Sequence, residues 1–426
     1  MAACAGQDAR QPDDASPGPA KSAEAQAPVV PPPITSTSAA ASSSAEPAPV
    51  AVEAPAPAPE LPKGEPELSR FHAALRELAK GSRKNHVRVL WLGDSHGQAD
   101  FWTGALRDVL QKRFGKAGPG FVHVGWKAYR HDGMKLSIDG KWHIAPKAPA
   151  TSARTDDGVF GLGGVVTRGP AGTGKARATV TDEGLTSRLS WDVCYRLRAK
   201  TDELKIGLGQ NPTTTARVTS TEPAGEIRHL VLVSEGRDTL NITPTRGEPE
   251  LCGVVIETDP STNPGVVLDT LGINGARLGT PLAWDEASFG KELVRRNPSL
   301  VVLEYGTNEA GDYHVDPAKY TQKLIKLMER IRKFAPDTDC VALAPTDRAD
   351  TRERTPLVRD AIREGARTAG CSFWDTYAAM GGEGSIRSWK AEAQPRASAD
   401  GVHLTPRGYR QLGEALATHL LTGLPE

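Results

Sequence analysis

The feature that most limits the fold is a change of pattern along the chain. Apolar, strand-like runs alternate with helical patterns toward both ends of the folded part, and the long segment between them holds only short β-like runs. Strands that alternate with helices predict a doubly wound parallel sheet. Short strands separated by turn residues predict an all-β sandwich. We therefore expect an α/β domain with an inserted β module.

The α/β pattern combines a helical period with continuous apolar runs. Apolar residues recur at helical spacing within residues 67–80, and the nearly continuous apolar run 86–92 is typical of a strand buried on both faces of a parallel sheet. Later strands are predicted over 300–305, 340–344 and 372–374, and helices over 101–114, 317–334, 355–369 and 406–421.

The β module is expected between residues 130 and 268. Its short β-like runs are 177–181, 188–197, 203–208, 228–233, 239–243 and 252–258. The predicted division is therefore a tether over 1–66, a discontinuous α/β domain over 67–129 and 269–426, and the β module over 130–268.

Residues 1–66 are rich in Pro, Ala and Ser and contain no aromatic residue. Such a segment buries too little apolar surface to offset the entropy cost of ordering, so we expect it to be disordered. Met1-Ala2-Ala3-Cys4 is similar to the end of a bacterial lipoprotein signal, in which a cysteine receives lipid. Two interpretations stay open: a lipid anchor at Cys4 outside the inner membrane, or a flexible cytoplasmic tail.

The charge balance argues against two classes of partner. The chain has 52 Lys and Arg residues against 52 Asp and Glu residues, which does not favour a nucleic-acid groove or an anionic membrane surface. No run of about 18 apolar residues is present, so no transmembrane segment is predicted. No Cys or His pattern has zinc spacing, and we expect neither a metal nor a cofactor.

Four cysteines fall within the folded part. They either form the disulfides Cys194–Cys252 and Cys340–Cys371, one in each folded unit, or remain buried thiols.

A serine in the first α/β unit is the candidate nucleophile. Gly93-Asp94-Ser95-His96 follows the strand predicted over 86–92 and precedes a helix. Ligand sites of parallel sheets lie at the carboxyl ends of the strands, where Ser95 is placed. A serine hydroxyl needs an imidazole to accept its proton and a carboxylate to orient that imidazole. The alternative interpretation of Ser95 is a helix cap.

The imidazole and the carboxylate have candidates in a single block. In Asp400-Gly401-Val402-His403, just before the last helix, a tight turn can direct Asp400 and His403 into one cleft. The alternative is an ordinary surface turn. Donors for an oxyanion are available from the Asn308 side chain, which follows the strand 300–305, and from the backbone of Gly275.

These four blocks, in this order, resemble the SGNH (GDSL-like) hydrolase family, which is named for its Ser, Gly, Asn and His blocks. The resemblance implies a flavodoxin-like three-layer fold. It also implies Ser95 as nucleophile, His403 as base and Asp400 as the residue that orients His403. The oxyanion hole would consist of the N–H groups of Ser95 and Gly275 with the Asn308 side chain.

Three departures from the common family pattern narrow the expectation. His96 stands where the first block usually has Leu, Glu309 stands where the third usually has Asp, and the β module separates Ser95 from Gly275. This combination resembles the periplasmic peptidoglycan O-acetylesterases, in which the insert resembles a carbohydrate-binding module. The resemblance implies a serine esterase of the cell envelope that removes acetyl groups from peptidoglycan through an acyl-enzyme.

Other functions are compatible with the same residues. Small esters or another acetylated polysaccharide, such as xylan, would use the same three groups. An O-acyltransferase would differ only in transferring the acetyl group to a sugar hydroxyl, and a catalytically silent protein would bind glycan through the β module.

Two further signals have more than one interpretation. The run 169–176 is close to a phosphate-binding loop, but it has Ala176 where that motif needs Ser or Thr, and an extended run follows it. We therefore expect a Gly-rich hairpin loop there. Trp126, Trp142, Trp191 and Trp284 either stack on sugar rings or pack in the core, and Trp389 is a candidate for lining the cleft.

Overall fold

The computed structural model describes residues 68–151, 156–209, 215–219, 225–351 and 353–424. All of them belong to one compact unit, which spans Pro57–Glu426. The predicted tether over 1–66, including Cys4, lies outside the described residues. Within the described ranges, no helix is both long enough and apolar enough to cross a membrane.

A parallel sheet forms the centre of the α/β part, as the sequence predicts. Its five strands lie in the order β13-β1-β14-β15-β16, and all paired neighbours are parallel. The strands are β1 (Val87–Gly93), β13 (Val266–Gly272), β14 (Leu300–Glu304), β15 (Asp339–Leu343) and β16 (Ser372–Trp374).

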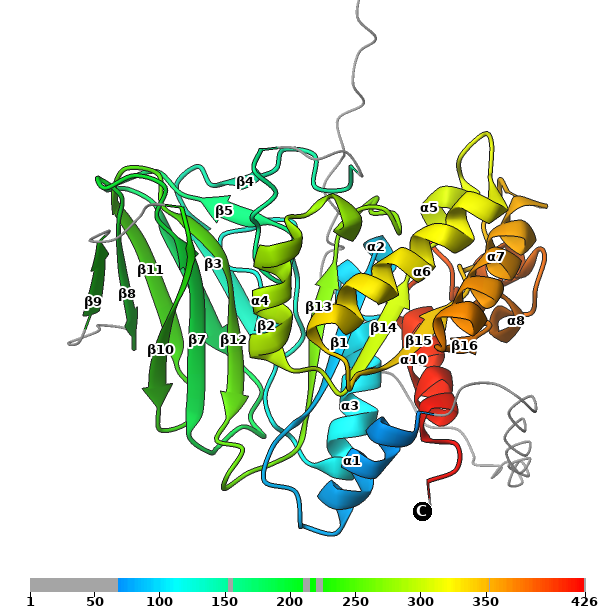
Figure 1. Ribbon diagram of the computed structural model, residues 1–426, viewed down its shortest axis with the longest axis horizontal. Coiled ribbons are helices and arrows are strands. Elements are labelled where there is room, and N and C mark those ends of the chain that lie inside the picture. The colour runs from blue at the N-terminus through cyan, green and yellow to red at the C-terminus, as the bar shows by residue number, and fades with distance from the viewer. Residues whose placement is uncertain (1–67, 152–155, 210–214, 220–224, 352, 425–426) are drawn as a thin grey trace, which may run out of the picture. The chain divides into compact units, whose positions relative to one another are not determined.

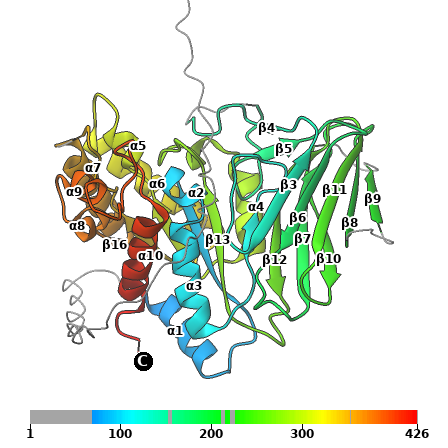
Figure 2. The ribbon, with the colours of Figure 1, turned by 180° about the vertical axis from the view of Figure 1, so that it is seen from behind.

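Helices cover both faces of this sheet (Figures 1 and 2). One face carries α4 (Glu286–Arg296), α6 (Pro317–Phe334) and α7 (Arg354–Ala369), and the other carries α1 (Ser69–Ala79), α3 (Trp102–Phe114) and α10 (Pro406–Leu421). Shorter elements are α2 (Ser95–Gln98), η1 (Pro281–Ala283), α5 (Thr307–Ala310), α8 (Thr376–Met380) and α9 (Ser385–Lys390).

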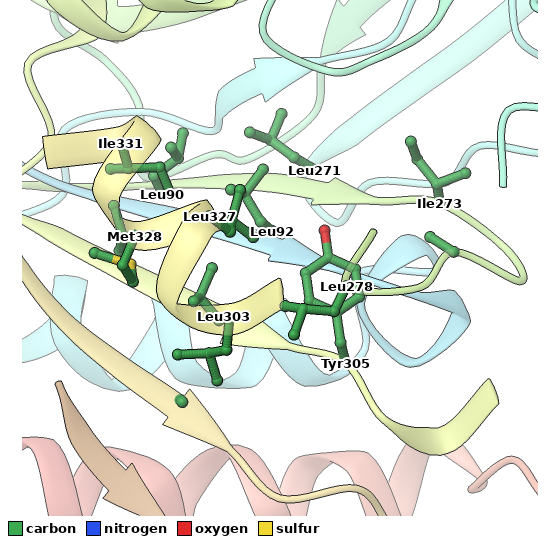
Figure 3. Packing of buried hydrophobic residues seen from close by; sticks show 14 of the residues in the cluster. Leu90, Leu92, Leu271, Ile273, Leu278, Leu303, Tyr305, Leu327, Met328 and Ile331 are labelled. Carbon is green, nitrogen blue, oxygen red and sulfur yellow. The ribbon is translucent and has the colours of Figure 1, made fainter. Parts of the chain in front are cut away.

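The apolar run of β1 is continuous because each of its faces meets a helix layer. Leu90 and Leu92 pack into the core below α6, whereas Val89 and Trp91 pack into the core on the α3 side. Figure 3 shows the first of these cores, in which side chains of β1, β13 and β14 meet Leu327 and Ile331 of α6. Alternate side chains of a strand point to opposite faces, so both faces need apolar residues.

Two antiparallel sheets account for the β-like runs. One has the order β10-β7-β12-β5-β4, with β2 also paired to β12, and the other has the order β3-β6-β11-β8-β9. Their strands are β2 (Gly120–Val122), β3 (Met134–Asp139), β4 (His143–Ala145), β5 (Val166–Arg168), β6 (Lys175–Val180), β7 (Leu189–Arg196), β8 (Glu203–Leu208), β9 (Thr215–Thr219), β10 (Ile227–Ser234), β11 (Thr239–Arg246) and β12 (Glu250–Thr258). Trp191 and Val254 of one sheet share a core with Ala178 and Ile242 of the other, and the views in Figures 1 and 2 show the sheets facing each other.

Strands cross the predicted domain boundaries at two places. β2 lies before residue 130 but pairs with β12, and β13 begins before residue 269 but pairs with β1 of the parallel sheet. The sequence analysis did not predict a strand over 266–272. The division of the chain into separate domains stays a prediction.

The run 169–176 joins β5 to β6 and leads into a strand, as the extended pattern after it predicts. β5 and β6 belong to different sheets, so the segment crosses between sheets and the expectation of a hairpin loop was wrong.

The four cysteines of the folded part form both of the disulfides considered from the sequence. Cys194 of β7 is bonded to Cys252 of β12, and Cys340 of β15 is bonded to Cys371, which precedes β16. The first bond joins two neighbouring strands of one sheet, and the second joins β15 to the residue just before its neighbour β16.

A buried network of charges connects the parallel sheet to the antiparallel one. Arg296 of α4 donates to Asp269 of β13 at 2.5 Å and 2.9 Å and to Glu257 of β12 at 2.5 Å. Glu257 also accepts two hydrogen bonds from Arg88 of β1. Arg296 and Asp269 are buried, so each charge depends on its partner and the two sheets are held in one relative position.

A histidine connects α4 to the same antiparallel sheet. His229 of β10 is hydrogen-bonded through Nδ1 to Asp192 of β7 at 3.0 Å and through Nε2 to Glu292 of α4 at 3.2 Å. Burial opposes the charged imidazolium, but these two carboxylates outweigh it and raise the pKa of His229 to about 9. Arg295 also pairs with Asp192. The protonated His229 therefore joins three elements.

We expect His229 to make the stability depend on pH. A pKa raised from 6.5 to about 9 means that the folded state binds the proton more tightly, so the stabilisation is complete below about pH 6.5 and is lost as the pH rises through 9. His229→Gln should remove up to about 3 kcal/mol of pH-dependent unfolding free energy between these limits. Urea unfolding at pH 6.5 and pH 9.5 measures the difference. His143→Gln, which replaces an exposed histidine, provides the control. If the pH dependence of His229→Gln equals that of the wild type, the assignment is contradicted.

Candidate active site

The site is set by the register of three neighbouring parallel strands. Gly93 of β1 lies opposite Gly272 of β13 on one side and opposite Glu304 of β14 on the other. The chain segments that carry Ser95, Gly275 and Asn308 leave these strands at the same level, so the three predicted blocks are adjacent.

Ser95 begins α2 directly after a tight turn. The Asp94 side chain caps this helix by accepting a hydrogen bond from His96 N at 2.9 Å. Gln98 of the same helix accepts from Asn274 N at 2.5 Å, which ties α2 to the loop that carries Gly275. Gly272 leaves room for this arrangement, because a Cβ there would overlap Gln98 N and lie 2.7 Å from Asp94 O.

The structure brings Ser95, His403 and Asp400 into one hydrogen-bonded chain. Ser95 Oγ lies 2.8 Å from His403 Nε2, and His403 Nδ1 lies 2.7 Å from Asp400 Oδ2. A carboxylate can only accept, so Nδ1 carries the hydrogen and Nε2 of the neutral imidazole is free to accept the Ser95 proton. The three groups therefore have the geometry that activates a serine.

Asp400 is held as a charged acceptor. Its Oδ1 accepts from the backbone N–H groups of Val402 and His403, both at 2.9 Å, within the turn that precedes α10. Partial burial opposes the charged form, but the hydrogen bonds from the His403 ring and from these two amides lower the pKa of Asp400 to about 2. Asp400 is therefore ionised at neutral pH, which orients the imidazole.

An open pocket of about 460 Å³ contains the reactive groups. Ser95, Gly275, Asn308 and His403 all line it. Its remaining lining residues are Ala99, Phe101, Asn274, Leu404 and Tyr409. Polar and apolar residues line the pocket together, and its volume leaves room for a sugar as well as for a short acyl group.

The Asn308 side chain is not free in this arrangement. Its Nδ2 donates to Asp94 Oδ2 at 3.1 Å and to Ala276 O at 3.0 Å, so both amide hydrogens have acceptors. Asn308 lines the pocket as expected, but to reach an oxyanion it would have to exchange one of these hydrogen bonds. Gly275 adopts a φ of +76°, which favours glycine there.

Three buried carboxyl groups, those of Asp94, Glu304 and Glu309, lie behind the pocket, and the sequence analysis did not identify them as a group. Glu304 accepts from Asp94 N at 3.1 Å. Burial and the neighbouring Asp94 raise the pKa of Glu304 well above its usual value, and burial raises the pKa of Asp94 to about 6. Glu304 therefore keeps its proton at neutral pH, while the ionised Asp94 can accept from both His96 N and Asn308.

Glu309 occupies the position at which the family usually has Asp. Its Oε1 accepts from Leu278 N at 2.8 Å, which fixes the segment after Gly275. Burial raises the pKa of Glu309 to about 7. The longer side chain thus supports the Gly275 loop from α5.

His96, the other departure from the family pattern, lies behind His403. Its ring centroid is 5.3 Å from that of His403, and its two nitrogens are hydrogen-bonded to Tyr409 Oη at 2.9 Å and Thr346 Oγ1 at 3.2 Å. Burial, followed by the proximity of His403, lowers the pKa of His96 to about 3. His96 therefore stays neutral and holds Tyr409 in the pocket wall.

One cluster in the described residues contains the residue types of a metal site, but its cysteine and histidine are already bonded to other groups. Cys194, His229 and Glu292 offer ligand atoms within 4.8 Å of one another. Metal binding by cysteine needs a thiolate. The Cys194 sulfur is part of a disulfide, and His229 is engaged by Asp192 and Glu292.

Two of the four tryptophans considered as sugar platforms pack in the core instead. Trp191 and Trp284 are buried, as is Trp389, which therefore does not line the cleft. Trp126 and Trp142 are half-buried.

Comparison with known proteins finds a family model that matches part of this chain. Residues 241–411 match the GDSL-like lipase/acylhydrolase family, a range that contains Gly275, Asn308, Asp400 and His403 and begins after Ser95. A search of the curated protein sequences finds no match.

Solved structures extend the likeness to most of the chain. A peptidoglycan O-acetylesterase matches with 27% identity and a TM-score of 0.69, covering 83% of this chain and 96% of that one. A family two carbohydrate esterase from Clostridium thermocellum matches with 12% identity and a TM-score of 0.29 over 68% of this chain and 99% of that one. The acetylxylan esterase Axe2 from Geobacillus stearothermophilus matches with 18% identity and a TM-score of 0.30 over 38% and 74%. Only the first is similar enough to bear on this chain.

We expect the close approach at Gly272 to be essential for the site. Gly272→Ala should displace α2, destabilise the fold by about 1–3 kcal/mol and slow the hydrolysis of 4-nitrophenyl acetate at least about tenfold, since small misplacements of reacting groups are costly. Gly184→Ala is the matched control, because a Cβ there would meet the movable end of Lys116. Equal rates for Gly272→Ala and the wild type would contradict the role given to this register.

Proposed function

The chain carries a domain of the GDSL-like lipase/acylhydrolase family and is a carboxylic ester hydrolase, and we propose that it removes O-acetyl groups from peptidoglycan. The observation that carries the proposal is the hydrogen-bonded chain Ser95–His403–Asp400 at an open pocket. The likeness over 83% of the chain to a peptidoglycan O-acetylesterase supports this polymer.

We assign the first step to Ser95 and His403. His403 Nε2 accepts the hydroxyl proton while Ser95 Oγ forms a bond to the acetyl carbonyl carbon. Asp400, which keeps its negative charge, stabilises the imidazolium that results. The carbonyl oxygen becomes an oxyanion at the rim of the pocket.

We assign the stabilisation of this oxyanion to three donors: the backbone N–H groups of Ser95 and Gly275 and the side-chain amide of Asn308. Ser95 and Gly275 line the pocket on adjacent loops. The Asn308 amide lies between Asp94 Oδ2 and Ala276 O in the structure without substrate. The developing negative charge is a stronger acceptor than the Ala276 carbonyl, so one amide hydrogen exchanges partners as the intermediate forms.

Collapse of the intermediate breaks the bond to the sugar oxygen, and the His403 imidazolium returns its proton to that oxygen. The product is a free sugar hydroxyl and an acetyl group on Ser95. Water then attacks the acetyl carbon with His403 as base, and the collapse of the second intermediate releases acetate and restores the Ser95 hydroxyl. The openness of the pocket admits this water.

We also propose that the enzyme acts in the cell envelope, with Cys4 as a candidate lipid anchor. Two disulfides support an oxidising compartment, because such bonds rarely persist in a reducing cytosol. Cell fractionation of the wild type and of Cys4→Ser tests this: release of the variant from the membrane fraction is expected, and recovery of both proteins in the cytosol would contradict it.

Acetate release from O-acetylated peptidoglycan tests the proposed function. Ser95→Ala and His403→Ala should each lower kcat by on the order of 10⁴-fold or more, because the three groups act as a unit. Asp400→Asn should lower it by on the order of 10⁴-fold, since the amide cannot hold the same tautomer of His403. Unfolding curves that match the wild type exclude loss of the fold.

Three outcomes would contradict the proposal. Equal acetate release from the wild type and Ser95→Ala would exclude Ser95 as the nucleophile. Hydrolysis of acetylated xylan but not of acetylated peptidoglycan would show that peptidoglycan is not the substrate. Transfer of acetyl groups to a glycan acceptor in excess of acetate release would show that the reaction is acyl transfer and not hydrolysis.

A further inference from the structure

One aromatic side chain of the described residues is almost fully exposed to solvent. The Tyr313 side chain is 85% exposed, whereas every other Phe, Tyr and Trp of the described residues is buried or half-buried. It lies in the loop between α5, which carries Asn308, and α6.

The loop of Tyr313 is fastened to the catalytic pocket. Asp312 accepts from Arg277 Nη2 at 2.5 Å, and Arg277 also contacts the carbonyl oxygens of Gly275 and Asn308 at 3.4 Å and 3.5 Å. Gly275 and Asn308 both line the pocket. Tyr313 is the next residue after Asp312, so its Cα lies ~3.8 Å from the Cα of the anchored residue.

The other end of the loop is also fixed. Val315 packs against the hydrophobic core, and Asp316 caps α6 by accepting from Lys319 N at 3.0 Å. His314 meets the Tyr313 ring edge to face, with centroids 4.8 Å apart. The ring is therefore exposed on a loop whose ends are held in place beside the pocket.

We propose that Tyr313 is a sugar-binding subsite that stacks on a pyranose ring next to the one that carries the acetyl group. This inference rests on the proposed function. It adds a residue that belongs neither to the four family blocks nor to the tryptophans considered as sugar platforms. Aromatic faces bind the C–H faces of sugars, whose edges remain polar and solvated. Tyr313 stands among the polar residues Asp312, His314 and Asp316, which suits a partner of mixed polarity.

The isolation of the ring favours a sugar over an apolar protein partner. A protein partner that docks through apolar contacts needs a continuous patch of several side chains. The other large apolar side chains exposed in the described residues are Val231, Val233, Val294 and Leu357, which lie on β10, α4 and α7 rather than in this loop.

Length dependence of deacetylation tests the subsite. Soluble O-acetylated peptidoglycan fragments of one sugar and of four sugars are compared with 4-nitrophenyl acetate, in the wild type, Tyr313→Ala and Tyr313→Phe. We expect Tyr313→Ala to raise KM for the longer fragment roughly 3- to 10-fold, the size of a stacking contact, with kcat unchanged. Tyr313→Phe should behave as the wild type, because the ring and not the hydroxyl makes the contact.

Two controls separate this role from a structural one. All variants should hydrolyse 4-nitrophenyl acetate at the wild-type rate, since that ester has no neighbouring sugar. Val294→Ala removes another exposed apolar side chain, on α4 and outside the pocket lining, and should change none of the KM values.

The outcomes distinguish the inference from the function on which it rests. A wild type that cleaves 4-nitrophenyl acetate but neither fragment overturns the proposed function, and the subsite with it. A wild type that cleaves both fragments with no advantage of length, or a Tyr313→Ala variant that keeps the advantage, overturns the subsite alone. A fall in kcat on all substrates would also overturn it, because it would give Tyr313 a structural role.

Discussion

The site depends on one constraint: three parallel strands end at the same level, and two of them end in glycine. Gly93 and Gly272 lie opposite each other, and a side chain on either would overlap its neighbours, Glu304 in the first case and α2 in the second. Because the three strands end at the same level, the loops with Ser95, Gly275 and Asn308 reach one pocket although 180 residues separate the first two in the sequence. The turn that carries His403 lies just before the last helix, α10, and places the His403 imidazole next to Ser95.

The same register of β1 and β14 explains why buried polar groups lie next to each other behind the pocket. Asp94 leaves β1 in a buried position next to Glu304 of the neighbouring strand, and burial together with the Asp94 carboxylate raises the pKa of Glu304, so that it keeps its proton. The protonated Glu304 and the ionised Asp94 form a pair in which Asp94 supports both the start of α2 and Asn308. His96 adds a second support by holding Tyr409 against the catalytic side of the fold.

Much of this arrangement could be predicted from the sequence, because it follows from local patterns. The helices over 317–334 and 406–421 and the strand over 372–374 have the predicted bounds, since their periods and end signals are strong. The strand Val266–Gly272 was not predicted. Its apolar run directly follows the β-like runs of the antiparallel sheets, and nothing in the sequence indicates that it belongs to the parallel sheet instead. The engagement of Asn308 by Asp94 and the exposure of Tyr313 could not be predicted, because both depend on contacts between residues distant in sequence or on burial.

The most direct test of the central claim is to identify the side chain that reacts. An organophosphate ester forms a stable adduct with an activated serine, and mass spectrometry of the digested protein locates it. The account predicts a single adduct on the peptide that contains Ser95, complete loss of ester hydrolysis when it forms, and no adduct in Ser95→Ala. Inactivation with the adduct on another residue, or full hydrolysis after Ser95 is modified, would contradict it.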